Sequence, residues 1–302
     1  MEKLSDSSKA KIYTGLCIFS WAFIPVVAKL GQIDLDNHQF LFWSSLISFI
    51  TLFSITLLSG KIGHFKEYDK KAILNAVFLG FLGAYLYYIF LYFGYAQAKG
   101  LEVLILQYTW PIFVVIFAYF FINEKLTLSR IIALMFGFVG ILIILTKGDI
   151  FSISFDKIKI NLIVLIGASF YAIFSVLGKK ANYEQFTMVT IFFFTATIAS
   201  FFSMIIFSDF KTLTIDSLFP VFLNGIFING ISYVFWFKAL KYGKVSSVAQ
   251  AVFFVPILSS VFLLLIFNER FLLIYLVGFI FILLSNLLVQ NKDKIKNIVV
   301  EE

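Results

Sequence analysis

The chain contains 302 residues, of which 61% are hydrophobic, 20% aromatic and only 14% charged, and its formal net charge is +7. Soluble proteins average about 25% charged residues and expose much of their surface to water, so this composition excludes a water-soluble enzyme and a nucleic-acid-binding protein. It also excludes a disordered chain, because disorder requires low hydrophobicity.

Apolar segments long enough to cross a bilayer follow one another along the chain. A helix needs about 20 mostly apolar residues to span the hydrocarbon core. Ten such segments are predicted, at residues 12–30, 38–58, 72–96, 101–122, 128–146, 160–178, 186–207, 217–240, 245–267 and 271–290. The linkers between them leave no separate soluble domain, so the sequence predicts an all-α integral membrane protein with ten transmembrane helices.

Basic residues predict the orientation of these helices. Most of the 24 Lys and Arg residues fall on one side when the N-terminus is placed in the cytoplasm, as the positive-inside rule requires. An even number of helices returns the C-terminus to the same side. We therefore expect a multi-pass protein of the cell (inner) membrane with both termini in the cytoplasm. Small residues such as Ala76, Gly80 and Ala84 share one helix face, and assigning them to packing within the chain favours a monomer.

The residues from which metal and nucleophilic sites are built are scarce. Cys17 is the only cysteine, and His38 and His64 are the only histidines. We expect no disulfide, metal site, catalytic residue or cofactor.

An internal repeat is the most informative feature of the sequence. An offset of 145 residues relates three pairs: Pro111 and Pro256, Glu124 and Glu269, and Tyr88 and Tyr233. Residues 21–29 also match residues 171–179 at an offset of 150 residues. The repeat divides the chain into two halves, residues 1–148 and residues 149–302. Each half holds five predicted helices, so the second half crosses the membrane in the opposite sense, which is the architecture of alternating-access transporters.

These residues resemble a known family. The five-plus-five plan, the Pro111…Asn-Glu-Lys125 and Pro256…Asn-Glu-Arg270 patterns and the segment 21–29 resemble the EamA family of the drug/metabolite transporter (DMT) superfamily. The run Leu106-Gln-Tyr-Thr-Trp-Pro111 is most similar to the YddG branch, which exports aromatic and other amino acids. The resemblance covers nearly the whole chain and implies a secondary transporter with a small-molecule substrate, no nucleic acid and no other partner than the bilayer.

Polar and aromatic residues within the apolar segments are candidates for a substrate cavity, because an amide in hydrocarbon is costly unless it is hydrogen-bonded. Tyr and Trp also combine an apolar face with a polar tip. The predicted cavity residues are Trp21, Tyr85, Tyr88, Gln107, Trp110, Tyr171, Asn229, Tyr233 and Gln250. Ordinary helix packing is the alternative for each of them.

Prolines inside three apolar segments are candidates for bends. Proline removes one helical hydrogen bond, and in a membrane the freed carbonyl needs a partner in the protein or in a cavity. We expect hinges or kinks beside the cavity at Pro25, Pro111 and Pro256, with a static bend as the alternative.

Acidic residues avoid the middle of every predicted segment. Glu102, Glu124 and Glu269 lie near helix ends. Since an intramembrane charge usually marks a functional site, this distribution gives no support for a buried carboxylate relay. We expect Glu124 and Glu269 to fix helix ends, with gating as the alternative.

The sequence thus predicts a transporter that exports amino acids, aromatic or neutral, through a cavity between the two repeats. A translocator of nucleotide sugars or lipid-linked metabolites is an alternative from the same superfamily. An integral membrane enzyme acting on lipid is an alternative from another class, but such an enzyme needs a nucleophile, base or metal near the membrane surface.

Overall fold

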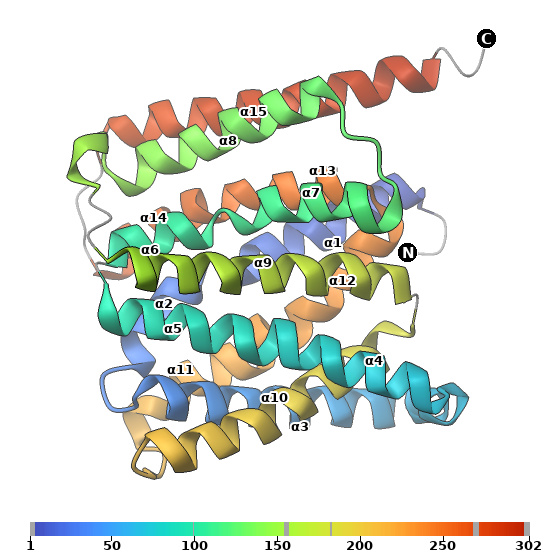
Figure 1. Cartoon of the computed structure of the whole chain (residues 1–302), viewed down its shortest axis with the longest axis vertical. Helices are drawn as coiled ribbons and strands as arrows, with labels where there is room; N and C mark the ends of the chain where they lie inside the picture. Colours follow the sequence, from blue (N-terminus) through green and yellow to red (C-terminus); the bar gives the residue numbers. More distant parts are fainter. Residues whose placement is uncertain (1–3, 99, 154–156, 182, 268–271, 299–302) are drawn as a thin grey trace.

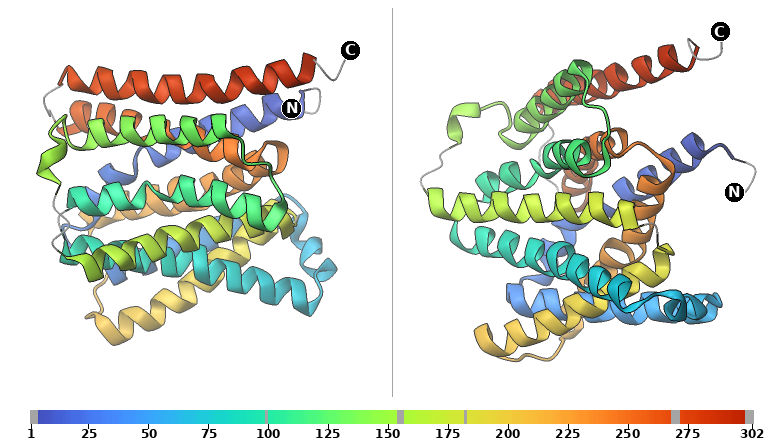
Figure 2. Two further views of the ribbon diagram at one scale, coloured as in Figure 1. Left: turned by 45° about the horizontal axis from the view of Figure 1, so that its top comes forward. Right: turned by 45° about the vertical axis from the view of Figure 1, so that its right-hand side comes forward.

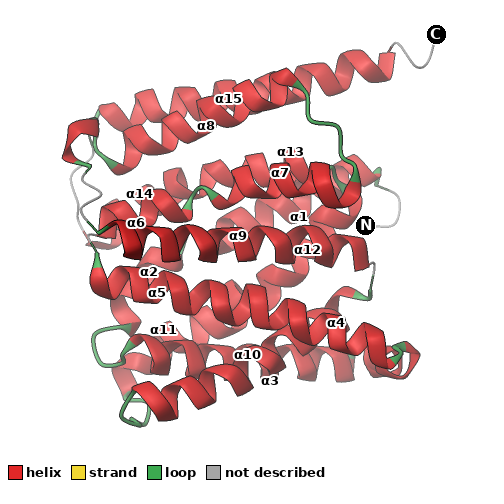
Figure 3. Cartoon of the chain, viewed as in Figure 1, coloured by secondary structure: helices red, strands yellow, loops and turns green. Residues whose placement is uncertain are grey.

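A computed structural model describes residues 4–98, 100–153, 157–181, 183–267 and 272–298, and every regular element in these ranges is helical (Figure 3). The first half of the chain contains α1 (Asp6–Trp21), α2 (Ile24–Gly31), α3 (Asn37–Leu58), η1 (Lys61–Glu67), α4 (Lys70–Gly80), η2 (Phe81–Leu86), α5 (Tyr87–Gln97), α6 (Gly100–Gln107), α7 (Trp110–Ile122) and α8 (Leu128–Leu145). The second half contains η3 (Ile150–Ser152), α9 (Ile158–Ala181), α10 (Gln185–Phe207), α11 (Ile215–Leu223), η4 (Asn224–Ile231), α12 (Ser232–Tyr242), α13 (Val245–Ala251), η5 (Val252–Phe254), α14 (Val255–Phe267) and α15 (Ile274–Ile298).

Seven helical segments in the described part of the chain are long and apolar enough to cross a membrane: Asn37–Leu58, Lys70–Gly94, Ile105–Ile122, Leu128–Leu145, Ile158–Ala181, Gln185–Phe207 and Ile215–Tyr242. The apolar helices Val245–Ser259 and Ile274–Ser285 are shorter. The first predicted segment is divided between α1 and α2. The all-helical membrane class agrees with the sequence, whereas the number of ten spans stays a prediction.

Local sequence signals explain where several helices begin. Asp36 precedes α3, and its carboxylate accepts hydrogen bonds from the backbone N–H groups of His38 (2.9 Å) and Gln39 (3.0 Å). Asp69 precedes α4 and accepts from the N–H of Ala72 at 2.7 Å. Such caps satisfy N–H groups that lack a partner in the first helical turn.

The helices run roughly alongside one another, and α8 and α15 form a pair at one edge of the molecule (Figures 1 and 2). Glycine permits the close contact of this pair. A Cβ added at Gly140 would lie 2.7 Å from the carbonyl oxygen of Gly278, and a Cβ at Gly278 would lie 2.7 Å from that of Gly140. Small residues at such contacts let the backbones of membrane helices approach closely.

Large apolar side chains cover the outside of the bundle. On α15 the exposed residues Leu276, Ile280, Leu283 and Leu287 recur every three or four positions and form one face. This pattern fits a helix that turns one face to the rest of the bundle and the other to lipid.

Two glycines show how the halves of the chain meet. A Cβ at Gly80 would lie 2.6 Å from the Cα of Phe192, and a Cβ at Gly225 would lie 2.6 Å from the Cβ of Ile47. Gly80 and Gly225 are 145 residues apart, and so are Ile47 and Phe192. The same contact therefore occurs twice with the halves exchanged, which is the pattern that a twofold relation produces.

Candidate functional site

Three helices are interrupted just before a proline. Helix α1 ends at Trp21 before Pro25, and α6 ends at Gln107 before Pro111. In the second half, η5 separates α13 from α14, which contains Pro256. Each proline is the second residue of the helix that follows, a position at which its missing N–H costs no helical hydrogen bond. Each of these helices is therefore broken inside the bundle, next to its proline.

Two further helices change their winding at repeat-related places. The π-helical segment η2 lies between α4 and α5, and the π-helical segment η4 lies between α11 and α12, each within one continuous helical segment. Segment η2 leads directly into Tyr87 and Tyr88, and η4 leads into Ser232 and Tyr233. A π segment changes the direction in which the following side chains point, and such segments are frequent at functional sites.

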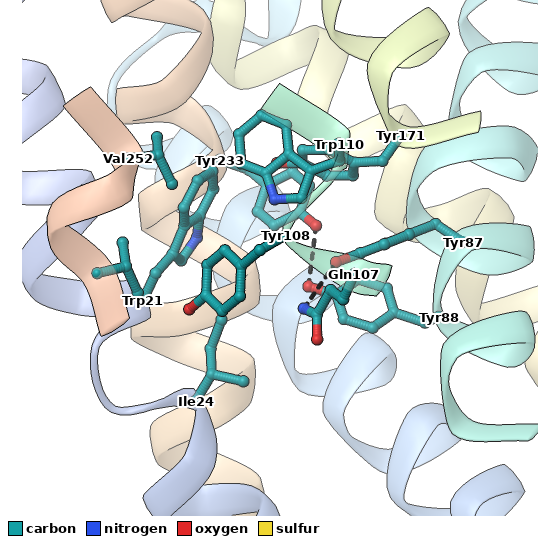
Figure 4. A pocket seen from close by; sticks show the side chains of 11 residues that line it. Trp21, Ile24, Tyr87, Tyr88, Gln107, Tyr108, Trp110, Tyr171, Tyr233 and Val252 are labelled. Atoms are coloured by element: carbon teal, nitrogen blue, oxygen red, sulfur yellow. Dashed lines mark hydrogen bonds between the residues drawn. The ribbon is translucent and has the colours of Figure 1, made fainter. Parts of the chain in front are cut away.

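A cavity of about 30 Å³ lies where these interruptions meet (Figure 4). We call it the central cavity. It is lined by Trp21, Ile24, Tyr87, Tyr88, Gln107, Tyr108, Trp110, Tyr171, Tyr233, Val252 and Val255. This volume has room for about two water molecules. A larger ligand needs the lining side chains to move apart.

Aromatic rings make most of the cavity wall. The Trp21 ring lies 6.1 Å from Trp110, 6.3 Å from Tyr171 and 6.1 Å from Tyr233, measured between ring centroids. Trp110 meets Tyr171 edge-on at 4.9 Å. Trp236, which does not line the cavity, backs this group at 5.3 Å from Trp21. Edge-to-face pairs of this kind are favourable, so the wall is packed as well as apolar.

Hydroxyl and amide groups join the aromatic wall at a few points. The hydroxyls of Tyr88 and Tyr233 lie 2.9 Å apart, and the Tyr88 hydroxyl donates to Asn229 Oδ1 at 3.0 Å. The Gln107 side-chain amide donates to the Tyr87 hydroxyl at 2.9 Å. Trp21 Nε1 donates to Ser232 Oγ at 2.8 Å. These bonds fix the orientation of four ring tips, those of Trp21, Tyr87, Tyr88 and Tyr233, in a low-dielectric environment.

Two buried polar groups at this level have no hydrogen-bond partner in the described part of the chain. They are the hydroxyl of Tyr171 and the side-chain N–H₂ of Asn229. Their side chains are 3% and 1% exposed. A buried polar group without a partner is costly, and of these two only the Tyr171 hydroxyl belongs to a residue that lines the cavity, where a polar ligand or water can reach it.

No lining residue of the central cavity carries a formal charge near neutral pH. The described residues also contain no cluster of three His, Cys, Asp or Glu side chains that could hold a metal ion. Cys17 is buried, His38 pairs with Ser203 and His64 with Glu67. The cavity can therefore bind through rings, hydroxyls and an amide.

The cavity lies at the meeting of the two sequence repeats. Eight of its eleven lining residues are four repeat-related pairs: Trp21 and Tyr171, Tyr88 and Tyr233, Gln107 and Val252, and Trp110 and Val255. The Tyr88–Tyr233 contact joins two mates directly. The contact of Trp21 with Ser232 also recurs, with the halves exchanged, as the Tyr171–Tyr87 ring contact at 4.7 Å.

The EamA-like transporter family model matches residues 9–146 and again residues 158–290. The chain belongs to this family. It is therefore a multi-pass membrane transporter with a small-molecule substrate, and the alternative of a lipid-acting membrane enzyme is wrong.

Two relatives of this EamA-like transporter are described as uncharacterized transporters. The transporter YoaV of Bacillus subtilis is 27% identical over 251 residues, covering 80% of this chain and 83% of YoaV. A transporter of Archaeoglobus fulgidus is 23% identical over 268 residues, covering 87% and 91% of the two chains. A protein of known crystal structure superposes with a TM-score of 0.81 at 16% identity, covering 92% of this chain and 96% of that one, which supports the fold.

The structure brings together six of the nine predicted cavity residues: Trp21, Tyr88, Gln107, Trp110, Tyr171 and Tyr233. Three do not line the cavity. Tyr85 packs against Phe81 with ring centroids 5.3 Å apart. Asn229 lies behind the Tyr88 hydroxyl. Gln250 donates to Ser285 on α15, at 2.7 Å to the backbone oxygen and 2.6 Å to Oγ, so in this structure it makes a helix-packing contact.

The sequence argument missed five lining residues: Ile24, Tyr87, Tyr108, Val252 and Val255. Tyr87 and Tyr108 stand next to Tyr88 and Gln107 in the sequence, so adjacency to the repeat motifs was the available signal. Val252 could have been found as the repeat mate of Gln107. Glu269 lies outside the described residues.

Proposed function

We propose that this transporter exports amino acids with aromatic or other neutral side chains by alternating access around the central cavity. The observation that carries the proposal is an uncharged, aromatic cavity at the meeting of the two repeats. Ring faces suit the apolar side chain of such a substrate and also attract its ammonium group. The Gln107 amide and the Tyr hydroxyls offer hydrogen bonds to its polar end. The resemblance of residues 106–111 to the YddG branch supports the same substrate class.

The architecture that we propose has ten membrane-spanning helices, divided as residues 1–148 and 149–302, with the second half inverted. The reciprocal contacts of Gly80 with Phe192 and of Gly225 with Ile47 support a twofold relation between halves. Two such halves interconvert inward-open and outward-open forms by exchanging their conformations. We place both termini in the cytoplasm of a cell that carries the protein in its plasma membrane as a monomer.

The interrupted helices supply the moving parts in this proposal. Pro111 and Pro256 each follow a break at a repeat-related position. Bending at these breaks would separate Trp110 from Tyr171 and enlarge the cavity. Replacing both prolines with alanine restores the N–H that continues a helix, and we expect slower transport with little change in substrate affinity.

Counterflow in proteoliposomes tests the substrate. Vesicles preloaded with unlabelled phenylalanine, leucine or alanine should accumulate the labelled amino acid when the purified protein is present. Gln107→Ala should raise the concentration for half-maximal exchange, because a hydrogen-bonding group of the cavity is lost. Gln250→Ala is the matched control, since this amide contacts Ser285 instead of the cavity. Exchange of nucleotide sugars or lipid-linked metabolites, with none for amino acids, would overturn the substrate and keep the fold.

A further inference from the structure

Glu124 makes a dense set of contacts just after α7. Its Oε2 accepts from the backbone N–H of Val245 at 2.9 Å, and its Oε1 accepts from the N–H of Ser246 at 3.1 Å. The Ser246 hydroxyl also donates to Oε1. Arg130 forms an ion pair with the same carboxylate at 3.2 Å. One side chain from the first half thus satisfies the N-terminus of α13 in the second half.

These charges are largely withdrawn from water. The side chains of Glu124 and Arg130 are 14% and 11% exposed. Arg130 further donates to the carbonyl oxygen of Lys125 at 2.8 Å. Hydrogen bonds to a carboxylate are stronger than those between neutral groups, and removal of one partner leaves the others buried without compensation.

A second polar contact, within the second half of the chain, lies close to this one. Lys179, near the end of α9, donates to the carbonyl oxygen of Gly243 at 2.7 Å. Gly243 follows α12 and stands two residues before Val245. The ends of α7, α9 and α12 and the start of α13 therefore meet at the end of the molecule that carries both termini (Figure 1).

This junction lies beyond the central cavity along α12. Tyr233 lines the cavity near the start of that helix, and Trp236 and Phe237 follow, 0% and 2% exposed. Gly178 on α9 leaves no room there, since a Cβ would lie 2.3 Å from the Phe237 ring. For a substrate to leave the cavity toward the termini, the packed side chains of Trp236 and Phe237 must move apart from α9. The contacts of Glu124 lie farther out along the same route.

We propose that Glu124 is a positioning residue that keeps the termini-bearing end of the transporter closed in this conformation. The inference rests on the proposed alternating access. In the form open at this end, α13 moves away from α7 and the carboxylate loses the N–H groups of Val245 and Ser246. Neutralising Glu124 shifts the population toward that open form.

Thiol accessibility tests this role without any substrate. The full chain with Cys17→Ala receives one reporter cysteine in the cavity, Val252→Cys, and is placed in vesicles. A C-terminal tag reports which end faces out. A membrane-impermeant maleimide is then added from the termini-bearing side or from the other side. We expect Glu124→Gln to speed labelling from the termini-bearing side about tenfold, equal to about 1.4 kcal/mol of population shift.

Two matched variants accompany the measurement. Glu67→Gln makes the same charge change at Glu67, which pairs only with His64 in the described part, and should leave the labelling rate unchanged. Ser246→Ala removes one hydrogen bond to Glu124 while keeping both charges, so a smaller increase is expected from the same side even if Glu124→Gln does not fold. An unchanged rate in both variants, or equal acceleration from both sides, would overturn the proposal and leave the substrate assignment untouched.

Discussion

Glycine-to-alanine changes at the contact between the halves offer a direct test of the packing. Gly80 faces the backbone of Phe192, with its Cα at 2.6 Å and its oxygen at 2.9 Å from an added Cβ. Backbone atoms cannot rotate away as a flexible side chain does, so an alanine at position 80 must push α4 and α10 apart. Gly15 on α1 is the matched control, because nothing lies within 4 Å of a Cβ placed there.

The magnitude follows from comparing the two substitutions. Both gain the same helix propensity, about 1 kcal/mol for Gly to Ala. Only Gly80→Ala adds a steric penalty, and overpacking costs about 1–3 kcal/mol. Gly80→Ala should therefore unfold with a free energy about 1–3 kcal/mol lower than that of Gly15→Ala. Gly225→Ala should show a similar loss, since its Cβ would meet Ile47 at 2.6 Å.

Reversible unfolding in mixed dodecylmaltoside–SDS micelles, followed by far-ultraviolet circular dichroism, measures these differences. The double change Gly80→Ala with Gly225→Ala should be roughly additive, because the two contacts involve different helices. If Gly80→Ala were as stable as Gly15→Ala, the close approach of α4 to α10 would be refuted, and with it the reciprocal contact between the halves.

Three other predictions concern single contacts. In a double-mutant cycle of Tyr88→Phe and Tyr233→Phe, unfolding should give a coupling of about 0.5–1.5 kcal/mol for the 2.9 Å contact, and zero coupling would contradict it. Burial opposes ionisation of Glu184, but bonds from Lys61 and Thr187 outweigh it and lower the pKa of this carboxyl. The resulting stability is present above the pKa of the unfolded carboxyl and is lost as pH falls through the folded value, so Glu184→Gln should flatten the acid limb of a stability–pH curve. Cys17, fully buried, should react with a water-soluble maleimide only after unfolding, and rapid reaction of the native protein would disprove its burial.

The internal repeat is the part of the sequence from which contacts between distant residues could be predicted. Apolar length predicts where membrane helices lie, because the bilayer sets that length. The offset of 145 residues paired Tyr88 with Tyr233, and their hydroxyls meet. When a residue contacts its own repeat mate across a twofold relation, the contact can be predicted from the offset alone, without knowing how the intervening helices pack.

Two of the predicted residues, Tyr85 and Gln250, do not line the central cavity, for reasons that the sequence pattern does not contain. Tyr85 lies three residues before Tyr88, so an uninterrupted α-helix would place both on one face. The π segment Phe81–Leu86 changes that register, and Tyr87 lines the cavity in place of Tyr85. Gln250 is an amide in an apolar segment, but its side chain turns to Ser285, which is distant in sequence. Periodicity carries no information about either feature.

The uncharged lining of the central cavity has a consequence for the response to membrane potential. Moving one elementary charge across 100 mV costs about 2.3 kcal/mol. None of the eleven lining residues carries such a charge, so rearranging these walls moves no fixed charge of the cavity through the electric field. A zwitterion carries no net charge either. Exchange of zwitterions through this cavity should therefore gain no voltage dependence from its lining, and any voltage dependence would report a charge elsewhere, either on a protein group that moves or on an ion that travels with the substrate.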